Sequence, residues 1–189
     1  FTARPYSSNE KKADAEVFGA HAVRTGNGRL LACYDVQLNE DGSLKQYRRI
    51  GENETAAGRK WYAYLETPDP NPWYNNQTYV NTLDKHAIER FVEITHEAYK
   101  RVVGDEFGKA IPAIFTDEPQ FSHKTPLTTA FSTGEAVMPW SDDLPDTFAA
   151  AYAEDLMDNL PQLFWELSEG KPSVIRYHFH DHVAERFAA

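Results

Sequence analysis

Residues 110–119 read Ala-Ile-Pro-Ala-Ile-Phe-Thr-Asp-Glu-Pro, and the fold that the sequence predicts depends on this stretch. Its first six residues are a short, nearly continuous apolar run, which is typical of a parallel strand buried on both faces. Before it, residues 84–103 carry apolar side chains at spacings of three and four, as an amphipathic helix does. A strand over residues 60–67, this helix and the 110–115 strand together predict one βαβ unit.

The first part of the chain is rich in predicted strands. Residues 17–23 and 29–36 are β-like runs, and the turn signals at 25–28 and 39–42 predict hairpins. Further on, Asp143 and Ser173 are predicted helix caps. We therefore expect an α/β fold, a partial (β/α)8 TIM-type barrel with β-hairpin decorations.

The domain organisation follows from the length. All 189 residues are expected to form a single unit, with 1–58 as a β-rich insertion and 59–189 as the βαβ barrel segment. A complete barrel typically needs about 250 residues, so we expect the chain to be an internal fragment of a longer polypeptide. The remaining domains of that parent chain are its expected partners, and any targeting signal lies outside the sequence, which leaves the localisation unknown.

Composition excludes several classes of partner. The formal net charge is −10, and the 19 basic residues are scattered among 29 acidic ones, which argues against nucleic acid. No run approaches the roughly 18 apolar residues that a membrane span needs. The single cysteine, Cys33, allows no internal disulfide. A neutral or small partner is therefore expected.

Two acidic residues follow the predicted buried strand. In α/β barrels, catalytic groups project from the carboxyl ends of strands, which is where Asp117 and Glu118 would lie. Glycoside hydrolysis uses a pair of carboxyl groups, one of them acting as the general acid. Neighbouring residues of an extended chain point in opposite directions, and Glu118 has the longer reach. We therefore expect Glu118 to be the acid and Asp117 to orient or tune it.

An aromatic loop is the predicted sugar contact. Three prolines at positions 68, 70 and 72 set an extended loop. Its tip mixes flat apolar rings with amide groups, a composition that suits stacking on a sugar and hydrogen bonding to its hydroxyls. The predicted contacts are Trp73, Tyr74, Asn75, Asn76 and Tyr79, with His123 and Trp140 added from the long irregular segment 120–141. Alternatively, the aromatic side chains only hold the loop itself in place.

Several of these stretches together resemble a known group of proteins. Residues 73–83, 91–97, 111–119, 139–145 and 176–177 are similar to large bacterial glycoside-hydrolase-like proteins near the α-L-rhamnosidases of glycoside hydrolase family 106. The similarity spans roughly residues 60–187. It implies a TIM-type barrel within a multi-domain chain, a glycan substrate, and hydrolysis of a glycosidic bond by the acid of the Asp-Glu-Pro motif. No cofactor and no metal are expected, and the isolated fragment is expected to be inactive.

Three other interpretations remain open. A non-catalytic carbohydrate-binding module would use the β-rich part and the aromatic loop without any acid. A zinc-dependent hydrolase would use His178 and His182, which lie four residues apart on a predicted helix. In a purely structural alternative, Asp117 forms a salt bridge with Arg176 or Lys124.

Overall fold

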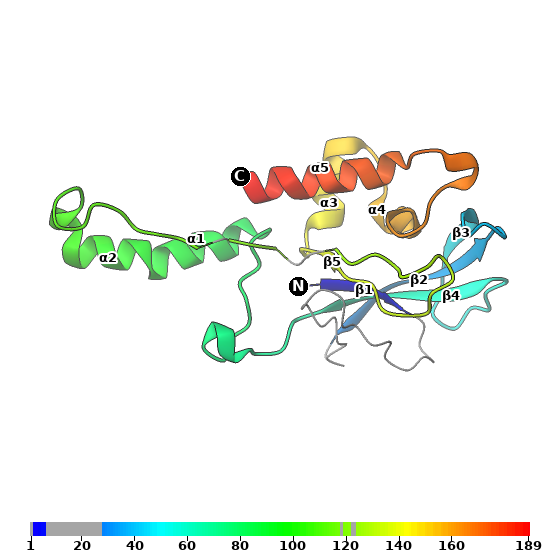
Figure 1. Ribbon diagram of the computed structural model, residues 1–189, viewed down its shortest axis with the longest axis horizontal. Helices are drawn as coiled ribbons and strands as arrows, with labels where there is room; N and C mark the ends of the chain where they lie inside the picture. The colour runs from blue at the N-terminus through cyan, green and yellow to red at the C-terminus, as the bar shows by residue number, and fades with distance from the viewer. Residues whose placement is uncertain (1, 7–27, 118, 122–123) are drawn as a thin grey trace.

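The computed structural model describes residues 2–6, 28–117, 119–121 and 124–189. A β-sheet forms one layer of a compact body, and helices cover one face of that sheet (Figure 1). A helical arm projects from this body, and the chain returns along it in an extended conformation. The molecule therefore consists of a sheet, the helices that cover it and the arm.

Five strands make up the sheet within the described residues. They are β1 (Thr2–Tyr6), β2 (Arg29–Leu38), β3 (Leu44–Ile50), β4 (Arg59–Glu66) and β5 (Met138–Pro139), in the spatial order β3-β2-β4-β1-β5. Every pair of neighbouring strands is antiparallel. The turn predicted at residues 39–42 connects β2 to β3, and Gly42 has a φ of 84°, which glycine adopts at little cost. The predicted 17–23 strand and most of the 25–28 turn lie outside the described residues.

Three helices cover the sheet: α3 (Leu144–Tyr152), α4 (Leu156–Asn159) and α5 (Val174–Ala188). The predicted cap Ser173 accepts a hydrogen bond from the backbone N–H of Arg176 and starts α5. Asp143 holds the predicted cap position of α3, but its side chain makes no capping hydrogen bond and instead accepts from Ser141 and Arg186. The core between sheet and helices centres on Trp61, whose ring lies 5.3 Å from that of Phe164 and 5.2 Å from that of Trp165. This packing of apolar side chains is the main stabilising contribution to the body.

The predicted helix over residues 84–103 forms the arm. It consists of α1 (Lys85–Ile94) and α2 (His96–Val103), separated at Thr95, and the Asp84 carboxylate caps its start. Backbone hydrogen bonds from Thr95 to Phe91 and from Tyr99 to Thr95 continue across the break. No residue of α1 or α2 is buried. The periodicity therefore predicts the helix correctly, but the helix does not pack against the core.

The barrel prediction is wrong. The sheet is antiparallel, so the described residues do not form a βαβ unit. Residues 112–117 are extended without strand pairing and are exposed, and the Phe115 side chain is 84 % accessible to solvent. Pro112 lacks the N–H that an inner strand donates, which disfavours a central strand here. The sheet also crosses the predicted boundary after residue 58, because β2 pairs with β4.

Among the described residues, none of the helices combines the length and apolar character needed to cross a bilayer.

Candidate functional site

The loop that carries the predicted sugar contacts is fixed by its own hydrogen bonds. The Asn71 side chain accepts from the backbone N–H of Trp73 at 2.8 Å, and this starts a short 3-10 helix, η1 (Pro72–Tyr74). The Asn71 N–H donates to the Gln77 carbonyl at 3.1 Å and closes the loop at its base. Asn75 and Asn76 both have left-handed backbone angles, which asparagine tolerates better than most residues. The loop is thus held in one shape by local interactions.

This shape presents Trp73 to solvent. Its side chain is 86 % exposed. Tyr74 is partly exposed and packs against Tyr79, with ring centroids 5.0 Å apart. The alternative that the aromatics only hold the loop in place therefore describes the pair Tyr74 and Tyr79 but leaves Trp73 unexplained. A large indole ring exposed on an ordered loop is the kind of surface that stacks on a flat apolar partner.

Two hydrogen bonds join this region to the acidic segment. The backbone N–H of Gln120 donates to the Tyr79 hydroxyl at 3.1 Å, and the Thr82 hydroxyl donates to the Gln120 carbonyl at 2.5 Å. Asp117, three residues before Gln120, is exposed on the extended segment. Glu118 and His123 lie outside the described residues. The structure thus ties the chain directly after the acidic pair to the end of the aromatic loop.

Trp140 lies elsewhere than predicted. Its side chain is 1 % exposed and belongs to the core, so it cannot stack on a ligand in solvent. It lines a cavity of about 30 Å³ together with Tyr79, Leu83 and Phe121. Pockets for small ligands measure about 300–1,000 Å³, so this cavity has room for water at most. Trp140 is therefore a core residue and does not form the predicted sugar contact.

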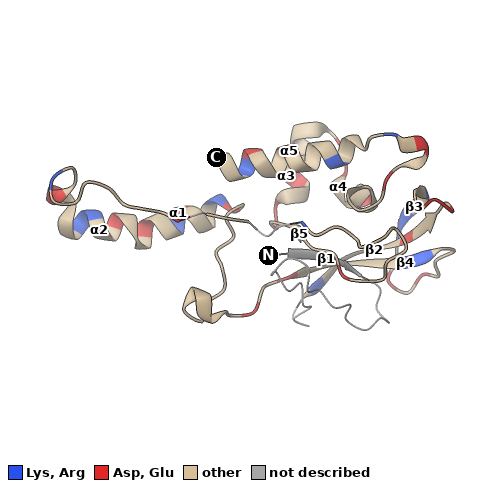
Figure 2. Ribbon diagram, viewed as in Figure 1, with Lys and Arg blue, Asp and Glu red and all other residues tan. Residues whose placement is uncertain are grey.

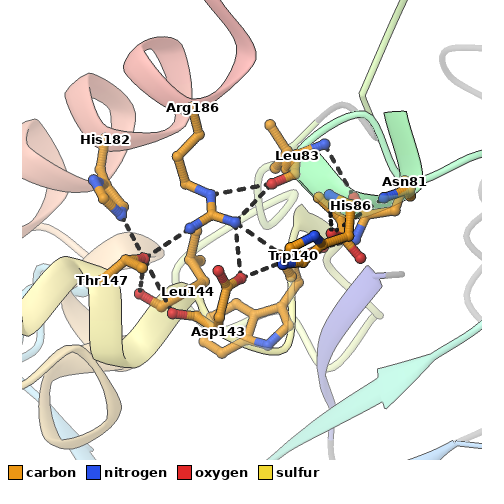
Figure 3. Close-up of polar contacts among 12 residues, drawn as sticks. Asn81, Leu83, His86, Trp140, Asp143, Leu144, Thr147, His182 and Arg186 are labelled. Carbon is orange, nitrogen blue, oxygen red and sulfur yellow. Dashed lines mark hydrogen bonds and ion pairs between the residues drawn. The ribbon is translucent and has the colours of Figure 1, made fainter. Parts of the chain in front are cut away.

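Arg186 forms a polar cluster that sequence reasoning missed (Figure 3). Its guanidinium donates to the Leu83 carbonyl at 2.7 Å, the Asp143 carboxylate at 2.8 Å and the Thr147 hydroxyl at 2.8 Å. Burial alone would raise the pKa of Asp143, but hydrogen bonds from Arg186 and Ser141 outweigh it and lower that pKa. The cluster fixes the segment after the aromatic loop to α3 and α5. No local pattern predicts it, because its members lie up to 103 residues apart.

The histidines considered for zinc have other roles. The His178 Nδ1 lies 2.8 Å from the Glu154 carboxylate, and its ring stacks on Tyr152 at 4.3 Å. The His182 Nε2 lies 2.9 Å from the Thr147 hydroxyl. Within the described residues, no group of three or more His, Cys, Asp or Glu side chains is arranged to hold a metal ion. This arrangement favours structural roles for both histidines.

The salt bridges suggested for Asp117 do not form between the described residues. The Arg176 guanidinium contacts the Glu166 carboxylate at 2.5 Å and the Trp165 carbonyl at 2.6 Å. The Lys124 ammonium donates to the Leu163 carbonyl and lies over the Phe164 ring. Burial lowers the pKa of Lys124 to about 8. Arg176 and Lys124 thus bind groups of residues 163–166 instead of Asp117.

Comparisons of the chain with protein-family models, with curated proteins and with solved structures gave no match.

Proposed function

We propose that this chain binds glycans through the loop of residues 71–79. A sugar ring stacks on Trp73, and the amide groups of Asn75 and Asn76 hydrogen-bond its hydroxyls. The observation that carries the proposal is the 86 % exposure of Trp73 on a loop closed by its own hydrogen bonds. A preordered loop loses little conformational entropy on binding, so more of the stacking energy appears as affinity. The negative net charge of the chain favours neutral glycans over anionic ones.

The first test compares two aromatic substitutions. Trp73→Ala removes the proposed stacking surface, whereas Tyr177→Ala removes a similarly exposed aromatic ring from α5, on a different element. Binding to a panel of neutral oligosaccharides is measured by calorimetry. We expect Trp73→Ala to weaken binding by about tenfold or more, equivalent to about 1.4 kcal/mol. Equal affinity in the two variants would refute the stacking role of Trp73.

A second candidate function, hydrolysis of a glycosidic bond, is favoured by a separate observation. The hydrogen bonds from Gln120 to Tyr79 and from Thr82 to Gln120 tie the segment after Asp117 and Glu118 to the proposed sugar loop. A carboxylic acid near a bound glycosidic oxygen can act as the general acid. In this proposal Glu118 donates the proton and Asp117 tunes it. Because the fold is not a barrel, a position at the end of a barrel strand no longer supports this proposal. Its support is the hydrogen-bonded link between the segment after the two acids and the proposed sugar loop.

The two candidate functions are separated by Glu118→Gln in the full-length parent chain, because the isolated fragment is expected to be inactive. A glycosidase keeps glycan affinity but loses turnover of oligosaccharides, whose alkoxide leaving group needs protonation that the amide cannot supply; general acids typically contribute about 10²–10⁴-fold in rate. A binding module shows unchanged affinity and no turnover in either form. Glu106→Gln, an exposed glutamate on the arm, is the matched control. Normal turnover with Glu118→Gln would exclude Glu118 as the acid while leaving the Trp73 binding proposal standing.

A further inference from the structure

The arm formed by α1 and α2 has an apolar stripe along its length. Seven side chains fall on one face of the helices at spacings of three and four: Ile88, Phe91, Val92, Thr95, Tyr99, Val102 and Val103. None of them is buried, and exposure reaches 64 % at Tyr99 and 82 % at Val102. Amphipathic helices in water gain most of their stability by burying such a face. The stripe therefore requires a partner surface.

The spacing within the stripe matches a helix-pairing seam. Ile88, Val92, Thr95, Tyr99 and Val102 are separated by alternating steps of four and three residues, which is the a/d pattern of a coiled coil. This pattern presents a narrow apolar line to another helix with the same line. A second copy of the arm supplies such a helix.

Charge on the arm disfavours a membrane or nucleic acid as the partner. Basic and acidic side chains alternate along α1 and α2 (Figure 2). Two of the ion pairs lie within the arm, Arg90 with Glu93 and Lys100 with Glu97. Helices that bind anionic membranes carry mainly Lys and Arg on their polar face. A surface of mixed charge instead suits contact with another surface of mixed charge, such as its own copy.

The exposed apolar area is sufficient for a dimer. Besides the stripe, Ile94, Phe107, Ile114 and Phe115 are exposed on the arm and on the returning chain. Taking about 150–250 Å² for a whole aromatic side chain, the arm and the returning chain together expose on the order of 700 Å² of apolar surface, close to the roughly 800 Å² that each partner contributes to a standard interface.

We propose that two copies of this chain dimerise by packing their arms antiparallel, with the two-fold axis near Thr95. This alignment places Val102 of one copy opposite Ile88 of the other, and Tyr99 opposite Phe91. A groove of about 370 Å³ lies at the base of the arm between α1 and α5 and is lined by Ile88, Val92 and Phe187. Because Ile88 lines this groove, Val102 near the tip of one arm enters the groove of the other copy. In a parallel pair, both compact bodies would compete for the same end of the seam (Figure 1).

Sedimentation equilibrium of the whole chain over a wide concentration range tests the dimer. We expect a monomer–dimer equilibrium whose dissociation constant rises at least about tenfold with Val102→Glu, because a carboxylate would be buried opposite Ile88. Val174→Glu, at a 54 % exposed valine that starts α5, should leave the constant unchanged. Far-UV circular dichroism confirms that both variants keep their helices. A monomer at every concentration, or a dimer insensitive to Val102→Glu, would overturn the proposal.

Disulfide trapping tests the antiparallel alignment. Chains carrying Ile88→Cys are mixed with chains carrying Val102→Cys and are then oxidised. The native Cys33 is buried and does not interfere. We expect cross-links between the two different chains to exceed those between two Val102→Cys chains. Cross-links mainly between two Val102→Cys chains would instead show a parallel pair and overturn this alignment. Neither experiment involves a glycan, so both test the dimer independently of the proposed glycan binding.

Discussion

Single residues set the local shapes that surround the candidate site. Asp84 and Ser173 cap their helices through side-chain oxygens, and Asn75 and Asn76 take left-handed backbone angles in the aromatic loop. Such roles depend on the nearest few residues, so the Ser173 cap is predicted from sequence. The partners of Arg186 and the burial of Trp140 depend on distant segments. The sequence around each residue therefore does not predict them.

His182 should make stability depend on pH. Burial, followed by the charge of Arg186, lowers the pKa of His182 below its ordinary value of 6.5. The unfolded chain therefore binds a proton on this ring at higher pH than the folded chain does. The contribution to the free energy of unfolding is complete above about pH 6.5 and is lost as the pH falls through the lower folded pKa.

Urea unfolding of wild type and His182→Gln, at about pH 7.5 and about pH 5.5, measures this contribution. We expect the wild type to lose more stability on acidification than the variant. Partial desolvation, followed by the charges of Lys124 and Arg176, also lowers the pKa of the exposed His180, so His180→Gln should reduce the pH dependence in the same direction but by less. Identical losses in wild type and His182→Gln would contradict the assignment to His182.

At the level of elements, the predicted helix over residues 84–103 forms, whereas the predicted strand over residues 110–115 does not. The arm forms because its pattern is repeated over five turns, and helical hydrogen bonds join residues four positions apart. A strand needs partners from elsewhere in the chain, and an apolar run of six residues does not specify them. Residues 112–117 pair with no strand of the antiparallel sheet. Asp117 therefore follows an exposed segment without strand pairing and does not lie at the end of a buried strand.

Asp35 is expected to stabilise the connection between β3 and β4. This buried carboxylate on β2 accepts hydrogen bonds from the backbone N–H groups of Gly58 at 2.8 Å and Ala57 at 3.0 Å. A side chain at position 58 would meet the Val36 carbonyl, so the connection passes close to β2. Asp35→Ala leaves both donors without this acceptor and should reduce the free energy of unfolding by about 2–4 kcal/mol.

Chemical unfolding monitored by tryptophan fluorescence measures this change, because Trp61 lies in the core. Asp35→Asn keeps one acceptor oxygen and should cost less than Asp35→Ala. Asp105→Asn, at an exposed carboxylate beside the arm, should stay within about 0.5 kcal/mol of wild type. A loss with Asp35→Ala no larger than that control would contradict a stabilising role for Asp35.

At the level of the whole molecule, the body and the arm should differ in stability. The body has a continuous core, whereas α1 and α2 have no buried residue. Local opening requires little energy where few apolar contacts are lost. We expect backbone amides of residues 85–103 to exchange hydrogen much faster than those of β2 and β4 in dilute solution. If the arms pair, raising the protein concentration should slow exchange in the arm and leave the sheet unchanged.

Hydrogen exchange followed by mass spectrometry at two concentrations provides this comparison. Val102→Glu should remove the concentration dependence, and Val174→Glu should preserve it. Exchange in the arm as slow as in β4 at every dilution would show that the arm is stable without a second copy.

The position of β1 has a consequence for synthesis of the protein. Residues 2–6 pair with β4 on one side and with β5 on the other. On the ribosome this strand emerges well before residues 59–66, and residues 138–139 follow much later. During that interval its backbone groups are available to strands of neighbouring nascent chains. Translation speed between residues 6 and 66, and chaperone capture of the early chain, should therefore influence how much protein reaches the folded state.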